Sequence, residues 1–291
     1  MSNNALTKTA RFEAAGRFVG AFAALRELVS RQVAKTPRRN GIARLKIISC
    51  LILVASASAL AQAPSDTVKE AQRLARVAQV AQQEGRYDDA IRAYETITVV
   101  AKSSPKTAAS AFLNIGNVYM TQRKYEEASN SFRRSISLDP NSAEAQNNLG
   151  EAQGELKQYS PALEAFQKAI ALDRTFVKAR YNMGVIYDHM GRPKYAEFVF
   201  RILIRDFPDY ALAYDSLAVA LSKSGRAREA IQLHEKAISL EPNDASFYYN
   251  FAISYLVLGD TRRAQEQQQK VRQLDPAMAE HLAMVIAKHQ R

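Results

Sequence analysis

The sequence predicts an all-α protein built as an array of repeated helix pairs, and two observations support this prediction. Ala, Leu, Gln, Glu and Arg are abundant, Trp is absent, and no long stretch alternates apolar and polar residues as a half-buried strand would. In addition, one pattern of small and aromatic residues recurs at a fixed interval from residue 71 to the C-terminus. With 47% hydrophobic and 9% aromatic residues, the chain has enough apolar material for a packed core.

Small and aromatic residues carry the period. Two series of glycines, one series of alanines and one of phenylalanines each recur at the same 34-residue step: Gly116, Gly150 and Gly184; Gly191, Gly225 and Gly259; Ala128, Ala162, Ala196, Ala230 and Ala264; Phe132, Phe166 and Phe200. Small residues let two helices lie close together, and large ones fill the space between layers. Glycine in the turn of a pair permits a positive φ.

This pattern resembles the tetratricopeptide repeat family, whose repeats are helix pairs of about 34 residues. The resemblance covers residue 71 to the C-terminus and implies a right-handed superhelical solenoid of six helix pairs plus a C-terminal capping helix. The predicted repeats are residues 71–108, 109–142, 143–176, 177–210, 211–244 and 245–278, followed by the capping helix 279–291. Residues 103–106 are an insertion in the first repeat. Looser packing is expected where His234 and Gln268 replace the phenylalanine.

Most of the net charge of +11 lies near the N-terminus. Residues 1–46 hold ten basic and two acidic groups, which gives +8 and leaves 11 − 8 = +3 for the rest of the chain. Nucleic-acid binding needs clustered cations that neutralise phosphates. No run of this kind follows residue 46, so no nucleic-acid partner is expected.

Residues 41–63 have the three parts of a secretory signal peptide. Arg44 and Lys46 precede an uncharged run, and small residues follow it. Cleavage is expected near Ala61 or Ala63, which would give a periplasmic or secreted protein that begins with a linker over residues 64–70. The alternative is an uncleaved inner-membrane anchor, in which residues 41–63 are the membrane contact.

Residues 1–40 are a basic N-terminal extension, in which apolar side chains recur at helical spacing from Phe12 to Val33. Three interpretations remain open: a start codon placed too early, an extended leader, or an organelle transit peptide. Cys50 is the only cysteine. Cleavage would therefore leave a mature chain without disulfides, thiol catalysis or cysteine metal sites.

No constellation of residues predicts catalysis, and neither a cofactor nor a metal is expected. The glycines are explained by packing and turns rather than by a phosphate loop. Asp188 and His189 form the only adjacent acid–histidine pair, and no serine or cysteine lies at a meaningful spacing from them. His281 and His289 lie more than two turns apart on a predicted helix, which is too far to share a metal. The sequence therefore predicts a binding protein rather than an enzyme.

The resemblance implies a concave groove lined by the first helix of each pair. The sixth position of four repeats is asparagine, as in the asparagine ladders with which some tetratricopeptide superhelices hold an extended peptide backbone: Asn114, Asn148, Asn182 and Asn250. An amide offers both a donor and an acceptor, which matches a peptide unit. Other groove positions hold Asn117, Glu144, Asn147, Glu151, Lys178, Tyr181, Asp215 and Tyr249. Alternatively, the asparagines bond to neighbouring helices.

The expected function is that of an exported scaffold or adaptor, which binds a protein or an extended peptide in its groove within an envelope-associated assembly. One alternative is an inner-membrane-anchored subunit of a secretion or pilus-type complex. A second is a cytoplasmic co-chaperone that clamps the C-terminal carboxylate of a heat-shock chaperone. In that family pattern Asn117, Asn148 and Lys178 match, whereas Leu113 and Asn182 do not. The partner and the oligomeric state do not follow from the sequence.

Overall fold

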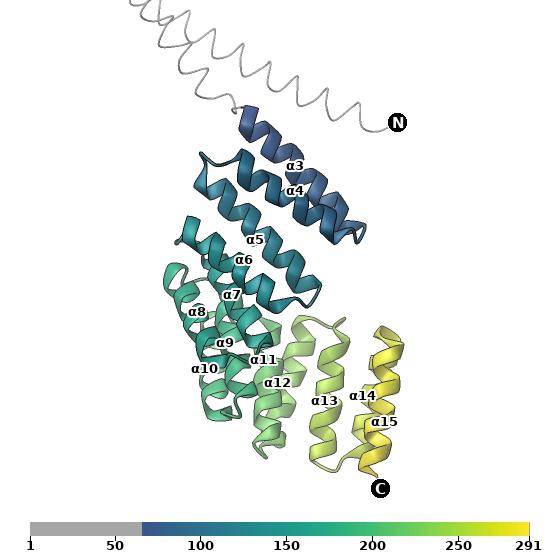
Figure 1. Cartoon of the computed structure of the whole chain (residues 1–291). Helices are drawn as coiled ribbons and strands as arrows, with labels where there is room; N and C mark the ends of the chain where they lie inside the picture. Colours follow the sequence, from purple (N-terminus) through teal and green to yellow (C-terminus); the bar gives the residue numbers. More distant parts are fainter. Residues whose placement is uncertain (1–65, 291) are drawn as a thin grey trace, which may run out of the picture. The chain divides into compact units, whose positions relative to one another are not determined.

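A computed structural model of the chain describes residues 66–290 (Figure 1). The chain divides into two units, Met1–Lys69 and Glu70–Arg291. Of the first unit only residues 66–69 are described, as the start of the first helix. The predicted N-terminal extension (1–40) and the predicted signal peptide or anchor (41–63) lie outside the described residues. Among residues 66–290, no helix is both long enough and apolar enough to cross a bilayer.

The described residues form thirteen helices, with no strand among them, and the predicted all-α array of six helix pairs with a final helix is confirmed. The helices are α3 (Asp66–Gln83), α4 (Tyr87–Val100), α5 (Pro105–Thr121), α6 (Tyr125–Leu138), α7 (Ala143–Glu155), α8 (Tyr159–Leu172), α9 (Val177–His189), α10 (Pro193–Asp206), α11 (Ala211–Lys223), α12 (Ala227–Leu240), α13 (Ala245–Val257), α14 (Thr261–Leu274) and α15 (Pro276–His289).

A residue with positive φ closes the turn within every helix pair. Four of the six are glycines, and two are charged residues with φ of 59°: Gly85, Arg123, Lys157, Gly191, Gly225 and Gly259. The next residue then donates its N–H back into the first helix, as Arg192 does to the carbonyl of Tyr187 at 2.9 Å. Glycine reaches this conformation without steric cost, whereas Arg123 and Lys157 adopt it with some strain.

Glycine at the eighth position of repeats two to four lets the two helices of a pair touch. A Cβ atom on Gly116 would lie 2.4 Å from the ring of Phe132. The same construction places a Cβ 2.6 Å from Phe166 at Gly150 and 2.5 Å from Phe200 at Gly184. Real Cβ atoms do not approach other atoms so closely, so the buried phenylalanine requires glycine opposite it.

The first helices of successive pairs lie side by side. From α5 onward each contacts the next, through α7, α9, α11 and α13 to α15. The second helices, α6, α8, α10, α12 and α14, make no comparable contacts with one another. The stack is therefore closest along its first helices, which makes their common face the concave one (Figure 1).

Three predicted boundaries differ from the observed ones. The predicted linker 64–70 is helical from Asp66 onward, because a carboxylate in the first turn interacts favourably with the helix dipole. The predicted insertion 103–106 ends inside α5, since proline is well tolerated in the first turn and α5 begins at Pro105. The final helix begins at residue 276 rather than 279, because the Asp275 side chain caps it by accepting the N–H of Met278 at 2.9 Å.

Candidate binding groove

A chain of four side-chain amides crosses three first helices on the concave face. Asn182 Nδ2 on α9 donates to Asn147 Oδ1 on α7 at 3.1 Å. Asn147 Nδ2 donates to Asn148 Oδ1 at 3.1 Å, and Asn148 Nδ2 donates to Asn117 Oδ1 on α5 at 2.9 Å. Asn147 is 0% exposed, whereas the other three are half-buried. The structure therefore brings together four of the asparagines predicted to line the groove.

Glu151 joins this amide chain to a cation. Its Oε1 accepts from Asn147 Nδ2 at 2.7 Å and from Asn182 Nδ2 at 2.8 Å, and it lies 2.8 Å from Nζ of Lys178. Lys178 is exposed. One carboxylate on α7 thus holds an amide of its own helix and two side chains of α9.

A second ion pair repeats this arrangement one helix further along. Lys223 Nζ on α11 lies 2.6 Å from Asp188 Oδ2 on α9, just as Lys178 on α9 reaches Glu151 on α7. In both cases the lysine pairs with an acid on the preceding first helix. The predicted absence of a catalytic partner for the Asp188–His189 pair stays a prediction, and the structure assigns Asp188 an ion pair instead.

The remaining ladder asparagines have different partners. Asn114 Nδ2 donates to the backbone carbonyl of Ser110 in its own helix at 3.0 Å. Asn250 Nδ2 on α13 donates to Asp215 Oδ2 on α11 at 2.7 Å. Between Asn182 and Asn250 the column holds a serine, Ser216, whose hydroxyl donates to that of Tyr181 at 3.2 Å. The column is therefore not a uniform ladder.

Aromatic residues pack around Tyr181. Its ring lies 6.0 Å from that of Phe200 and 5.8 Å from that of Tyr210, measured between ring centres. Burial raises the pKa of both phenols, and that of Tyr210 reaches about 12. Both hydroxyls therefore remain protonated, and available as hydrogen-bond donors, across the physiological range.

A buried polar cluster joins α11, α12 and α13. His234 Nδ1 on α12 lies 2.8 Å from Asp215 Oδ1 on α11, and His234 Nε2 lies 2.8 Å from Ser254 Oγ on α13. Ser254 Oγ lies 2.7 Å from Ser222 Oγ. The imidazole is 0% exposed and stacks on Phe251 with 5.2 Å between ring centres. The prediction of looser packing at His234 is therefore wrong, because α11 and α13 supply a partner for each ring nitrogen.

The bonds from Asp215 through His234 to Ser254 have the order of a catalytic triad. A triad needs its hydroxyl beside a space that a substrate carbonyl can enter. Ser254 is 1% exposed, and its oxygen is also bonded to Ser222. The cluster is therefore a structural link between three helices. Its members lie 19 and 20 residues apart in the sequence, and the only signal of it there is a histidine at a phenylalanine position.

A polar contact also joins α13 to the final helix. Tyr249 on α13 shares a hydrogen bond of 3.0 Å between its hydroxyl and Nδ1 of His281 on α15, and the two rings stack. Gln268, predicted to pack loosely, is half-buried, and its Nε2 donates to the backbone carbonyl of Ala279 at 3.2 Å. Within residues 66–290, no three His, Cys, Asp or Glu side chains are arranged to hold a metal ion.

Family models and solved structures of known proteins match this chain. Family models described as "Tetratricopeptide repeat" match residues 143–176, 165–198, 213–246 and 235–266, and one described as "TPR repeat" matches residues 116–157. A solved structure of MamA is 31% identical, with 58% of this chain and 97% of that chain covered and a TM-score of 0.50. The chain belongs to the tetratricopeptide repeat family.

Other tetratricopeptide structures agree in fold. A second structure of MamA is 29% identical, with 61% of this chain and 95% of that chain covered and a TM-score of 0.50. A tetratricopeptide repeat protein from Parabacteroides merdae is 20% identical with a TM-score of 0.64, covering 76% of this chain and 87% of that one. PilW, a type IV pilus biogenesis factor, is 24% identical with a TM-score of 0.62, covering 74% of this chain and 98% of that one. No curated protein matches the sequence. Tetratricopeptide arrays are in general protein-interaction scaffolds, which extend a concave binding surface.

Proposed function

We propose that the chain is an exported scaffold or adaptor that binds an extended segment of another protein along its first helices, within an envelope-associated assembly. The observation that carries this proposal is the amide chain from Asn182 to Asn117. Its bonds hold four side chains in place before a ligand arrives, which reduces the entropy lost on binding.

The two ends of the amide chain have the capacity to bind a peptide. The NH₂ group of Asn117 and the Oδ1 atom of Asn182 have no hydrogen-bond partner within residues 66–290. One is a donor and the other is an acceptor, and both belong to half-buried residues on the concave face. A peptide unit offers the complementary carbonyl and N–H. This chemistry holds a backbone without selecting its side chains.

The proposal assigns the chain no catalytic role, cofactor or nucleic-acid partner. The one triad-like cluster found within residues 66–290 has a buried hydroxyl, at Ser254. Most of the positive charge precedes residue 47, so little is available for a phosphate-binding surface on the repeats.

A sharp test of groove binding replaces Asn117 with Asp. The carboxylate still accepts from Asn148, so the internal bond is kept, but the donors that would face a ligand are lost. Asn130→Asp is the matched control, because Asn130 is an exposed asparagine on the outer helix α6. Residues 64–291 of each form would be used as bait in envelope extract, and enriched proteins would be quantified by mass spectrometry.

The expected result is a set of partners retained by the unmodified chain and by Asn130→Asp but lost by Asn117→Asp. Titration of the leading partner should show a loss of about 0.5–1.5 kcal/mol for the missing amide donor. Thermal melting should be nearly unchanged, since the internal bond remains. Equal capture by all three baits would contradict groove binding.

Export is tested on the native protein. Cleavage after Ala61 or Ala63 gives an N-terminus of Gln62 or Pro64, which protein sequencing of the soluble envelope fraction would detect. Recovery of the intact leader in the membrane fraction would replace this proposal with the inner-membrane anchor.

A further inference from the structure

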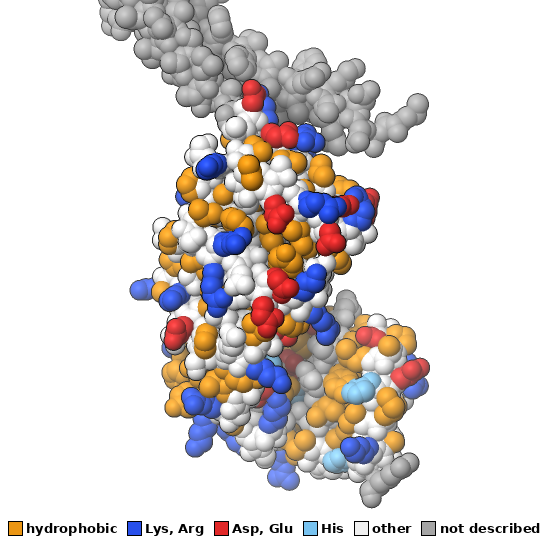
Figure 2. All heavy atoms as spheres, in the orientation of Figure 1, with side chains coloured by type: hydrophobic (Ala, Val, Ile, Leu, Met, Phe, Trp, Pro, Cys, Tyr) orange, Lys and Arg blue, Asp and Glu red, His pale blue; other side chains and the backbone are white. Residues whose placement is uncertain are grey.

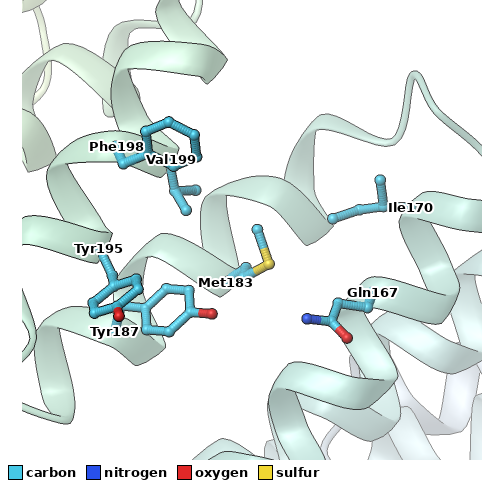
Figure 3. A pocket seen from close by; sticks show the side chains of 7 residues that line it. All are labelled: Gln167, Ile170, Met183, Tyr187, Tyr195, Phe198 and Val199. Atoms are coloured by element: carbon cyan, nitrogen blue, oxygen red, sulfur yellow. The ribbon is translucent and has the colours of Figure 1, made fainter.

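An apolar cleft lies on the outer layer of the array, away from the amide chain. Its volume is about 330 Å³. Figure 3 shows Ile170 and Gln167 of α8 on one side, Tyr187 of α9 with Tyr195, Phe198 and Val199 of α10 on the other, and Met183 of α9 between them. Tyr187 and Tyr195 stack with 5.3 Å between ring centres, so this wall of the cleft is held in place.

Two large aromatic side chains at this cleft are exposed to solvent. Tyr195 is 57% exposed and Phe198 is 65% exposed. They occupy the nineteenth and twenty-second positions of their repeat, and both positions face outward from the second helix. Exposed aromatic residues that gather beside an apolar cleft are typical of an interaction surface.

The other repeats show what these two positions hold when no such surface is needed. At the nineteenth position the chain has Asp89, Glu127, Pro161, Glu229 and Arg263, and at the twenty-second it has Arg92, Asn130, Glu164, Gln232 and Glu266. All of them except Pro161 are charged or polar, and none is aromatic. The aromatic pair in repeat four is therefore not required by the tetratricopeptide fold.

On α10, which forms one wall of the cleft, cationic side chains outnumber carboxylates. Lys194, Arg201 and Arg205 are exposed on this helix. Its two acids are already shared, since Glu197 pairs with Arg201 and Arg226, and Asp206 pairs with Arg180 and Arg205. Figure 2 shows basic side chains beside hydrophobic ones over this part of the surface. Unpaired carboxylates on a partner would find complementary charge here.

The exposed area of Tyr195 and Phe198 indicates whether a second copy of the chain or a short segment binds here. A tyrosine or phenylalanine side chain presents roughly 150–250 Å². The exposed fractions of Tyr195 and Phe198 therefore leave about 200–300 Å² to be covered. A stable dimer needs about 800 Å² per partner. The cleft is large enough for one or two apolar side chains, which a short segment can supply.

We propose that this outer cleft, formed by α8, α9 and α10, binds a short amphipathic segment of another protein whose large apolar side chain is flanked by carboxylates. The apolar side chain lies between α8 and α10 against Met183, and the carboxylates face the arginines and the lysine of α10. Because the cleft is on the outer layer, the concave groove can be occupied at the same time.

The proposal is tested with a fluorescein-labelled amphipathic peptide made of Glu and Ala, with three Leu on one face. Its length is about 15 residues, because shorter isolated helices are marginal in water. Anisotropy titration of residues 64–291 should give a dissociation constant in the tens of micromolar. Phe198→Glu should weaken binding at least about tenfold, since it removes the exposed ring and adds a repelling charge. Gln232→Glu, the equivalent position in repeat five, is the matched control and should bind normally.

Two further peptides separate the contributions of apolar contact and of charge to binding. Replacing Leu by Ser should abolish binding, and replacing Glu by Lys should weaken it at low salt. Melting of the Phe198→Glu variant should be unchanged, because the side chain is exposed. Absence of binding, or binding that Phe198→Glu leaves intact, would overturn the proposal. Dimerisation in sedimentation velocity that Phe198→Glu removes would overturn it in favour of a second copy of the chain. Failure of the Asn117→Asp test would not bear on this result.

Discussion

Replacing His234 with phenylalanine restores the residue that repeats two to four carry at this position, and the structure predicts that the change destabilises the protein. The phenyl ring can still stack on Phe251, but it has no nitrogen atoms. Asp215, 5% exposed, and Ser254, 1% exposed, would then each lose a hydrogen bond inside the array. The repeat pattern alone, in which phenylalanine is the usual residue here, would predict that the change stabilises the protein.

The magnitude follows from the two lost bonds. A hydrogen bond to a charged group contributes about 1.5–3 kcal/mol, and a neutral one contributes about 0.5–1.5 kcal/mol. The free energy of unfolding should therefore fall by about 2–4.5 kcal/mol, an effect that the more apolar ring offsets in part. Asn250 still donates to the carboxylate of Asp215, which keeps the group from being wholly unpaired.

Urea denaturation followed by circular dichroism would measure this loss. The control is the double variant His234→Phe, Ala218→Gly, compared with Ala218→Gly alone. Glycine then stands opposite the new ring, as it does in repeats two to four, so the loss that remains comes from the two missing hydrogen bonds. Unfolding of a repeat array need not be two-state, so the midpoints are compared under identical conditions. A His234→Phe variant as stable as the natural protein would refute the structural role of the cluster.

Three other changes test the packing. Gly150→Ala should lower the free energy of unfolding in urea by about 1–3 kcal/mol, because the new Cβ would lie 2.6 Å from the ring of Phe166. An unchanged midpoint would contradict this packing. Deleting residues 276–291 should lower the melting temperature and promote association, since α15 covers the apolar face of the last pair; a monomer with an unchanged melting curve would show that α15 is not a cap. Asn182→Ala removes two hydrogen bonds and leaves the buried Oδ1 atom of Asn147 without its donor. The free energy of unfolding, measured by thermal melting, should therefore fall by about 1–3 kcal/mol. No loss would show that the amide chain does not stabilise the array.

Much of the fold could be predicted because its rules are local. The repeat step, with glycine opposite phenylalanine, specifies how the two helices of one pair touch. Gly116 and Phe132 illustrate this, since both lie in one repeat and their spacing recurs. The helix ends were less predictable, because Asp66, Pro105 and Asp275 act through capping and dipole effects that do not follow the repeat.

The candidate groove could be predicted as a set of positions but not as a set of bonds. The sixth-position asparagines were identified from the sequence, yet Asn148 turns to Asn117 whereas Asn114 turns to its own helix. An amide can donate and accept in several directions, so its partner depends on which side chains the neighbouring helix presents.

The architecture of this protein follows from its sequence alone: the helix pairs, their number, and the face formed by the first helices. The pairing of its polar groups, in contrast, is settled only in the folded array. His234, Asp215 and Ser254 come from three helices of two repeats, and no single repeat contains the cluster. A period encodes contacts within a repeat, whereas hydrogen bonds between unlike residues of adjacent repeats depend on distances and directions that exist only once the helices have stacked.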